Sequence, residues 1–275
     1  TSFITKRRLM YKLALGIEYV GTNYSGWQRQ VQKSQILSVQ AEVERAISYV
    51  ANHEVSTICA GRTDAGVHAY GQVVHCEVMA DRSMHGWVFG CNSVLPRDIR
   101  VLWAKIVPED FDARRSAIAR QYKYIVYNSK MRPGLLYEYL AWHYRALDAE
   151  KMHVAAQDWL GVHDFSSFRS AGCQSLSPVR DMLSIQVSRS GEFITFDITA
   201  NAFLYHMIRN MVGVLFEIGG GKKPVAWAKE VLAVKNRSKA SITAPAQGLY
   251  LAGVRYPERF QIVECKSGLW FFNQG

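Results

Sequence analysis

The order of short apolar segments is the feature that most constrains the fold of this chain. Residues 1–110 predict strand, helix, strand, strand, helix and strand, and residues 111–275 repeat that style. Strands are expected over residues 12–19, 55–59, 72–78, 99–107, 121–127, 182–188, 193–200 and 249–256. Helices are expected over residues 39–51, 84–95, 149–160, 202–218 and 224–234.

Two halves of this kind predict an α+β fold. Each half is expected to be ferredoxin-like or RRM-like, and the two sheets are expected to meet edge to edge as one extended, mainly antiparallel sheet. We place the boundary between Val107 and Ala119, with an N-terminal subdomain over residues 1–110 and a basic C-terminal subdomain over residues 111–275. A cleft is expected to open across the join.

The charge of the chain is unevenly distributed. The 275 residues carry a formal net charge of +10. Residues 1–110 hold 12 Lys and Arg against 10 Asp and Glu, a net of +2, whereas residues 111–275 hold 21 against 13, a net of +8. A positive face of this kind suits a polyanion such as a nucleic acid, although a generally basic soluble protein would show a similar total.

The residue pattern argues against a disulfide-rich protein, a zinc protein and a membrane protein. The five cysteines are odd in number and contain no Cys-x-x-Cys pair, which favours reduced thiols in a cytosolic protein over a disulfide framework or a zinc site. The eight histidines show no metal-ligand spacing. No run of about 18 apolar residues predicts a membrane span, and no apolar segment follows Lys6–Arg8 as a secretory signal requires. We therefore expect a cytoplasmic protein without a bound metal.

The segment Cys59–Ala69 places a carboxylate on a tight loop between two expected strands. Gly61 and Gly66 bracket Arg62 and Asp64, and glycines permit the backbone conformations that a sharp loop needs. A rigid loop on a packed sheet positions a reacting group well. Asp64 can equally cap its own turn, because aspartate commonly bonds to loop backbone.

The segment Arg62–His68 (Arg-Thr-Asp-Ala-Gly-Val-His) closely resembles the central motif of the tRNA pseudouridine synthase A family. Further segments match the family in its expected order along the chain, at residues 14–19, 24–29, 120–124, 164–169, 201–210 and 244–251. The resemblance extends from about Tyr11 to about Pro257. One position departs from the family, which usually has an acidic residue where this chain has Val20, so the role of that carboxylate is open here.

The resemblance implies an isomerase that converts uridine to pseudouridine at positions 38 to 40 of the tRNA anticodon stem-loop. It also implies a homodimer, a central catalytic cleft, and no metal or cofactor. The reaction breaks the C1′–N1 bond, rotates the uracil and joins C1′ to C5, so it needs no redox change and no group donor. The base must first be flipped out of the RNA. A carboxylate can then act as a nucleophile or assist removal of the 2′ proton, and the sequence leaves both routes open.

The resemblance also assigns roles to individual residues. Asp64 is the catalytic carboxylate, and Arg62 fills the space left by the flipped base or, alternatively, binds phosphate. Tyr122 lies against the uracil, where its ring can stack and its hydroxyl can relay a proton. Tyr124 shares the same strand face, and only the match to the family favours Tyr122.

Arg209 lies in an otherwise apolar expected helix, where an unpaired charge is costly. The family pairs this arginine with the catalytic aspartate, which would keep Asp64 ionised; alternatively, its side chain extends from the helix edge to water. His206, one turn earlier, is assigned no catalytic role. Leu249 and Tyr250 resemble the apolar wall of the family's uracil pocket, although they also fit ordinary strand core.

A basic run begins the second half of the chain. Its members suit a groove for the RNA backbone, because they alternate with aromatic residues and only Asp112 opposes them. The alternative is an ordinary solvated face. The run comprises Arg114, Arg115, Arg120, Lys123, Lys130 and Arg132, of which the first three are our candidate RNA contacts.

Two other classes of protein compete with this interpretation. A non-catalytic RNA-binding module with ferredoxin-like halves would be expected to lack Asp64 or its arginine partner, and both are present. A methyltransferase should show a glycine-rich nucleotide loop after the first strand, but Gly21–Gly26 does not have the G-x-G-x-x-G pattern. The sequence therefore favours a tRNA pseudouridine synthase.

Overall fold

The computed structural model describes residues 10–29 and 37–262, so Lys6–Arg8 lie outside the described residues. The N-terminal half contains β1 (Tyr11–Tyr19), α1 (Val39–Ala51), β2 (Ile58–Cys59), β3 (His68–Val78), α2 (Met84–Val94) and β4 (Ile99–Val107). The C-terminal half contains β5 (Ala119–Asn128), β6 (Ala141–His143), α3 (Ala149–Gln157), β7 (Gly161–Asp164), β8 (Val179–Ser190), β9 (Phe193–Ala200), α4 (Met207–Gly219), α5 (Trp227–Val234) and β10 (Leu249–Arg255). Short 3-10 turns lie at Ser166–Phe168, Arg237–Lys239 and Glu258–Phe260.

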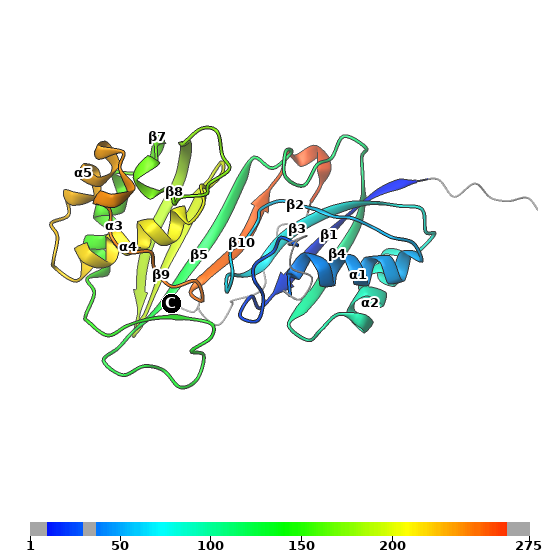
Figure 1. The fold of residues 1–275 in the computed structure, drawn as a ribbon, viewed down its shortest axis with the longest axis horizontal. Helices are drawn as coiled ribbons and strands as arrows, with labels where there is room; N and C mark the ends of the chain where they lie inside the picture. The colour runs from blue at the N-terminus through cyan, green and yellow to red at the C-terminus, as the bar shows by residue number, and fades with distance from the viewer. Residues whose placement is uncertain (1–9, 30–36, 263–275) are drawn as a thin grey trace, which may run out of the picture.

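The described strands form one sheet in the order β4-β1-β3-β10-β5-β9-β8-β7, with β2 paired to β3 and β6 paired to β5 (Figure 1). The first half has the neighbours β4-β1-β3-β2 and the second has β10-β5-β9-β8, all antiparallel. Both halves therefore share the strand order of a ferredoxin-like fold, and the predicted α+β class is confirmed. The division of the chain at residue 110 stays a prediction.

The two halves meet where β3 runs parallel to β10. Tyr250 pairs with His68 and Leu251 with Ala69 across this join. Gly71 sits at the same place, and a Cβ added there would lie 2.1 Å from the carbonyl oxygen of Ala252. A side chain at residue 71 would push the two strands apart, so this glycine permits the close approach that makes one sheet from two.

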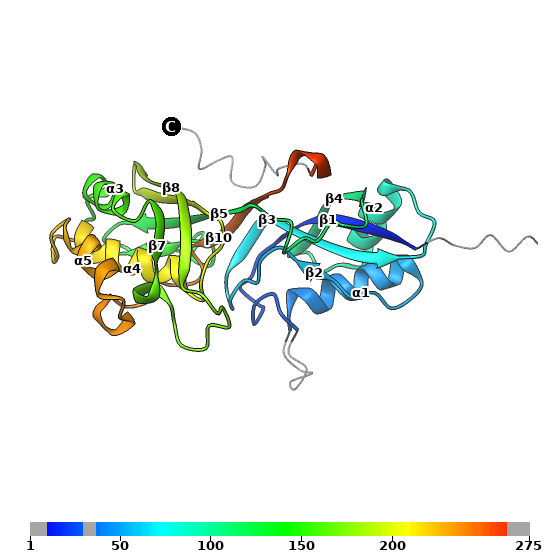
Figure 2. The ribbon, with the colours of Figure 1, turned by 90° about the horizontal axis from the view of Figure 1, so that it is seen from above.

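Helices cover the sheet in each half. Figure 2 shows α1 of the first half and α4 of the second half on the same side of the sheet. Side chains cap the first turns of α1 and α3: Ser38 accepts a hydrogen bond from the Ala41 amide, and Asp148 accepts one from the Lys151 amide. None of the helices in the described ranges is long and apolar enough to cross a membrane.

Several element boundaries differ from the prediction. Helix α4 begins at Met207 instead of residue 202, because His206 has a left-handed backbone with φ of 58° that a helix cannot contain. Helix α5 begins at Trp227 instead of residue 224, after a turn in which the Trp227 amide donates to the Pro224 carbonyl. The prediction missed β6 and β7, which are short and pair with the sheet along one side only.

Candidate active site

The loop between β2 and β3 carries Asp64, and the segment after β1 fixes its backbone. The Trp27 amide donates to the Thr63 carbonyl at 3.0 Å, and the Val67 amide donates to the Asp64 carbonyl at 3.1 Å. Gly26 has a φ of 96°, and a Cβ there would lie 2.5 Å from the Thr63 oxygen. Only glycine fits this contact, so the Gly-Trp-Gln segment serves as a backbone support for the Asp64 loop.

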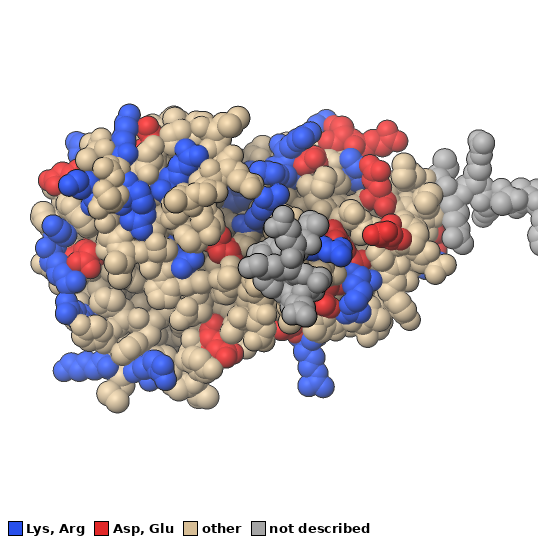
Figure 3. Space-filling model, viewed as in Figure 1, with Lys and Arg blue, Asp and Glu red and all other residues tan. Residues whose placement is uncertain are grey.

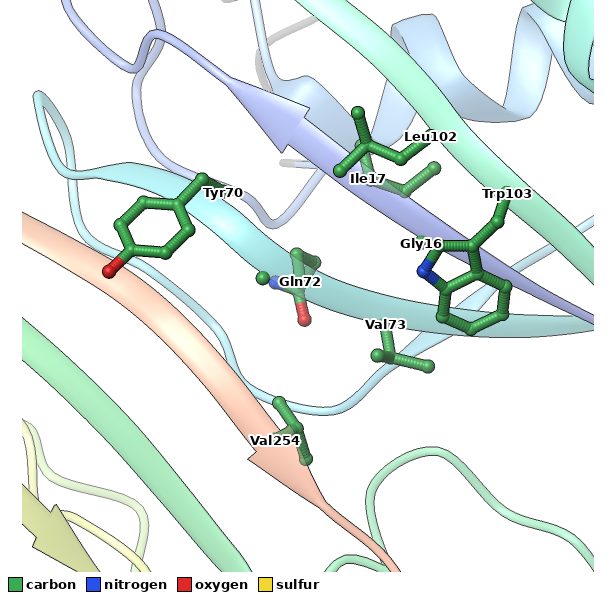
Figure 4. Close-up of a pocket in the computed structure, with 9 residues that line it drawn as sticks. Gly16, Ile17, Tyr70, Gln72, Val73, Leu102, Trp103 and Val254 are labelled. Carbon is green, nitrogen blue, oxygen red and sulfur yellow. The ribbon is translucent and has the colours of Figure 1, made fainter. Parts of the chain in front are cut away.

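Two buried side chains hold the same loop from below. The Tyr19 hydroxyl and the Thr63 Oγ1 are 2.7 Å apart. The fully buried amide of Gln72 donates to the Gly61 carbonyl at 2.7 Å and accepts from the Gly61 amide at 3.4 Å. Gln72 is among the residues that line a cavity of only about 10 Å³ (Figure 4). This volume is close to the minimum for one water molecule, so the cavity is a packing gap and not a ligand site.

The structure brings Arg209 and His206 to the Asp64 carboxylate. Arg209 Nη1 lies 3.7 Å and His206 Nε2 lies 3.4 Å from the same oxygen, Oδ2. The Arg209 side chain is only 15% exposed, and its Nε donates to the Ala244 carbonyl at 2.8 Å. Arg209 therefore points inward to Asp64 and does not extend to water.

The protonation of Asp64 reflects two opposing effects. Burial of the carboxyl raises the pKa of Asp64 above its ordinary value, while His206 and the Arg209 guanidinium oppose this rise. Burial also lowers the pKa of His206, against the effect of the nearby carboxylate. Asp64 consequently loses its proton at a higher pH than a free aspartate, and Arg209 is the permanent charge that favours the ionised form.

Tyr122 borders this group from the sheet. Its ring packs edge to face on Phe203 with a centroid distance of 5.1 Å. A Cβ built on Gly61 would lie 3.5 Å from the Tyr122 hydroxyl, so that hydroxyl lies against the Asp64 loop. Burial and then the Asp64 charge raise the pKa of Tyr122, which keeps it a protonated phenol. Tyr124, the alternative, is fully buried and donates to the Pro245 carbonyl, so it belongs to the core.

The two residues expected to form an apolar wall separate onto opposite faces of the sheet. In the β5–β10 register, Leu249 opposes Tyr124 and Leu251 opposes Tyr122, so these four side chains share one face. Tyr250 points to the other face. The structure therefore does not bring Tyr250 to the Asp64 group, and Leu251 takes the place expected for it.

The opposite face has a cavity of its own, with a volume of about 490 Å³. Tyr250 lines it and stacks on His68 with a centroid distance of 4.8 Å. Val20 lines the same cavity. The departure from the family at residue 20 therefore lies with this second cavity and removes no carboxylate from the Asp64 group.

Arg120 is not the free cation that the sequence suggested. Its guanidinium donates to the carbonyls of Ala60, Arg114, Ala117 and Asn201. These bonds use Nε, Nη1 and Nη2, and they occupy all five N–H groups. Arg120 thereby joins the Asp64 loop to the second half, and we call this set of contacts a clamp; its expected role as a phosphate contact stays a prediction.

The other candidate RNA contacts have exposed side chains. Asp112 accepts hydrogen bonds from the backbone amides of Arg114 and Arg115, whose guanidinium groups remain at the surface. Arg62 is also exposed and donates from Nη1 to Gln174 Oε1 at 3.1 Å, across the join. Figure 3 shows Lys and Arg concentrated over the C-terminal half and the middle of this face, whereas Asp and Glu gather over the N-terminal half. The described residues contain no cluster of three or more metal-ligating side chains.

Comparison with known proteins identifies the family. The sequence profile of the family described as tRNA pseudouridine synthase matches residues 16–114 and 155–257, and the chain belongs to this family. It is 52% identical over 262 residues to tRNA pseudouridine synthase A of Coxiella burnetii strain Dugway 5J108-111, covering 95% of this chain and 99% of the relative. It is 51% identical to the protein of that name from Escherichia fergusonii, covering 95% and 96%. The activity is therefore that of an isomerase acting on uridine in tRNA.

Proposed function

We propose that the chain isomerises uridine at positions 38 to 40 of the anticodon stem-loop, with Asp64 as the catalytic carboxylate and without a cofactor. The observation that carries this proposal is the Asp64–Arg209 ion pair beside Tyr122, on a loop held by its own backbone contacts. A half-buried carboxylate next to a fixed cation supports the role of a reactive group over that of a simple turn cap.

The proposed reaction uses the helix-side face of the join. The flipped uracil enters against the Tyr122 ring, with Leu249 and Leu251 beneath it on the same face of the sheet. Asp64 then attacks as a nucleophile or assists loss of the 2′ proton, while Arg209 stabilises its negative charge. Arg62, at the rim, exchanges its Gln174 contact for the space that the base leaves in the RNA.

The proposal extends to partners and location. Bound tRNA contacts the basic surface that includes Arg114 and Arg115, since phosphate contacts need exposed cations. The resemblance to the family adds a homodimer in the cytoplasm, with the two basic surfaces forming one long groove. Residues 1–110 and 111–275 are the two subdomains of each copy.

Tritium release from tRNA labelled at C5 of uracil tests the proposal, because it reports substitution at C5 directly. Transcripts with uridine at only one of positions 38, 39 or 40 should each release tritium, and a transcript with cytidine at all three should not. Asp64→Asn should release none while still binding tRNA. Equal release from the cytidine control would contradict the assigned positions, and an active Asp64→Asn variant would contradict the catalytic assignment.

A further inference from the structure

All described contacts to the Asp64 carboxylate fall on one of its two oxygens. Arg209 Nη1 and His206 Nε2 both approach Oδ2, at 3.7 and 3.4 Å. Within residues 10–29 and 37–262, no hydrogen bond or ion pair reaches Oδ1. The two oxygens are therefore not equivalent, since Oδ2 lies beside both basic side chains and Oδ1 keeps its lone pairs for a substrate.

We propose that His206 is a positioning residue that fixes Oδ2 of Asp64, so that Oδ1 is the oxygen that reacts. This inference rests on the proposed role of Asp64. Arg209 alone fixes the carboxylate from one direction and leaves its rotation about the Cβ–Cγ bond free. A second donor on the same oxygen restricts that rotation and directs Oδ1 to one place, which is how a nucleophile gains from orientation.

The backbone at His206 is arranged for this contact. His206 has φ of 58° and ψ of 9°, a left-handed conformation that is uncommon for residues other than glycine, although histidine adopts it more often than most. Its side chain makes no capping bond to α4. The ring instead stacks on Tyr205 with a centroid distance of 3.9 Å. An uncommon backbone that serves no cap, combined with a ring nitrogen 3.4 Å from the carboxylate, supports a functional role for His206.

The charged groups around His206 determine whether its imidazole is neutral or protonated. Asp64 faces it from the loop, Arg209 from its own helix, and Arg237 from the segment after α5. Burial lowers the pKa of His206, the Asp64 carboxylate raises it, and the two arginines lower it. The imidazole is therefore neutral near pH 7, and we assign its hydrogen to Nε2, which lies 3.4 Å from Oδ2. A neutral donor orients the carboxylate without cancelling the charge that the reaction needs.

Two substitutions at residue 206 separate this role from a structural one. His206→Gln places an amide N–H near the position of Nε2, so it should restore the contact. His206→Asn is the matched control, because asparagine accepts the left-handed backbone but its amide is too short to reach Oδ2. Neither change adds charge, and the Asn variant should fold at least as well as the wild type.

The experiment measures single-turnover tritium release from bulk C5-labelled tRNA across pH, together with tRNA binding. We expect His206→Asn to lower the single-turnover rate constant about 10- to 100-fold with tRNA affinity unchanged, in the range of a lost orienting group. His206→Gln should recover most of that rate. The acidic limb of the Asn profile should move to higher pH, because Asp64 loses a donor that favours its ionised form.

The outcomes distinguish this inference from the assignment of Asp64 itself. Bulk tRNA makes the result independent of which uridine is modified. A His206→Asn variant with wild-type rate and pH profile, beside an inactive Asp64→Asn variant, would overturn the role of His206 alone. A His206→Gln variant as slow as His206→Asn would also overturn it, because the donor would then not be the feature that matters. An active Asp64→Asn variant would instead remove the basis of the proposed function.

Discussion

Replacing Arg120 by lysine keeps the positive charge and removes the planar set of five N–H donors. This change therefore distinguishes a clamp from a phosphate contact. The Arg120 guanidinium donates five hydrogen bonds to carbonyls on three segments of the chain, whereas a lysine has three N–H donors on one nitrogen. At least two charge-assisted hydrogen bonds are lost, each worth about 1.5–3 kcal/mol. Water can reach the exposed bonds to Arg114 and Asn201, so we expect the lower end, a destabilisation of about 3 kcal/mol.

The measurement is the thermal midpoint of the purified variant. A loss of about 3 kcal/mol corresponds to a fall of about 6–12 °C for a chain of roughly this size. Arg115→Lys is the control, because Arg115 is exposed and the change should stay within about 0.5 kcal/mol. Arg120→Lys should also slow turnover with little effect on tRNA affinity, since the Asp64 loop loses its hold at Ala60.

The opposite result would refute the clamp. If Arg120 bound phosphate, Arg120→Lys would retain the thermal midpoint and most of the tRNA affinity, because lysine is itself a good phosphate contact. A midpoint within about 2 °C of the wild type, with normal turnover, would therefore show that the carbonyl contacts contribute little. Reduced tRNA affinity at an unchanged thermal midpoint would indicate that Arg120 contacts RNA after all.

Four further changes test other parts of the site. Asp64→Asn should abolish turnover and raise stability at pH 8. Because the pKa of Asp64 is higher in the folded protein than in the unfolded chain, the wild type loses stability as the pH rises above about 3.9. Melting curves should therefore show the stability advantage of the Asn variant disappearing below that pH. Arg209→Gln should raise the pKa of Asp64 further and move the acidic limb of the rate profile upward; an unmoved limb would contradict the ion pair. Tyr122→Phe should keep tRNA binding and lower kcat by about 10²–10⁴-fold if the hydroxyl relays a proton, whereas equal loss of binding and rate would contradict this role. Arg114→Gln combined with Arg115→Gln should weaken binding to any tRNA and reduce the slope of log affinity against log salt by about 0.7–0.9 per lost phosphate contact, measured by filter binding; an unchanged slope would place the RNA elsewhere.

The sequence predicted the parts of the site that depend on local pattern. The loop around Asp64 follows from its glycines and flanking strands, and the cost of an unpaired charge in an apolar helix pointed to a partner for Arg209. Tyr250 was separable in principle, because side chains two apart on a strand share a face and Leu249 therefore belongs with Leu251. A wall made of the adjacent residues Leu249 and Tyr250 is inconsistent with this alternation.

Other features could not have come from the sequence. The role of Arg120 depends on the neighbouring carbonyls of Arg114 and Ala117 and on the distant carbonyls of Ala60 and Asn201, which meet only in the folded chain. A basic run cannot show which of its members the fold will surround with acceptors. The left-handed backbone at His206 is similarly invisible, because an apolar segment from residue 202 predicts an uninterrupted helix.

The group around Asp64 forms only because the two halves are joined in a continuous sheet. The first half supplies the Asp64 loop, and the second supplies Arg209, His206 and Tyr122. Neither half contains both a carboxylate and its cation at this place, so the proposed chemistry requires the parallel contact of β3 with β10. The clamp at Arg120 and the close approach of the strands at Gly71 lie at this same join. Substitutions at either residue should therefore alter the geometry of the Asp64 group without a direct contact to it.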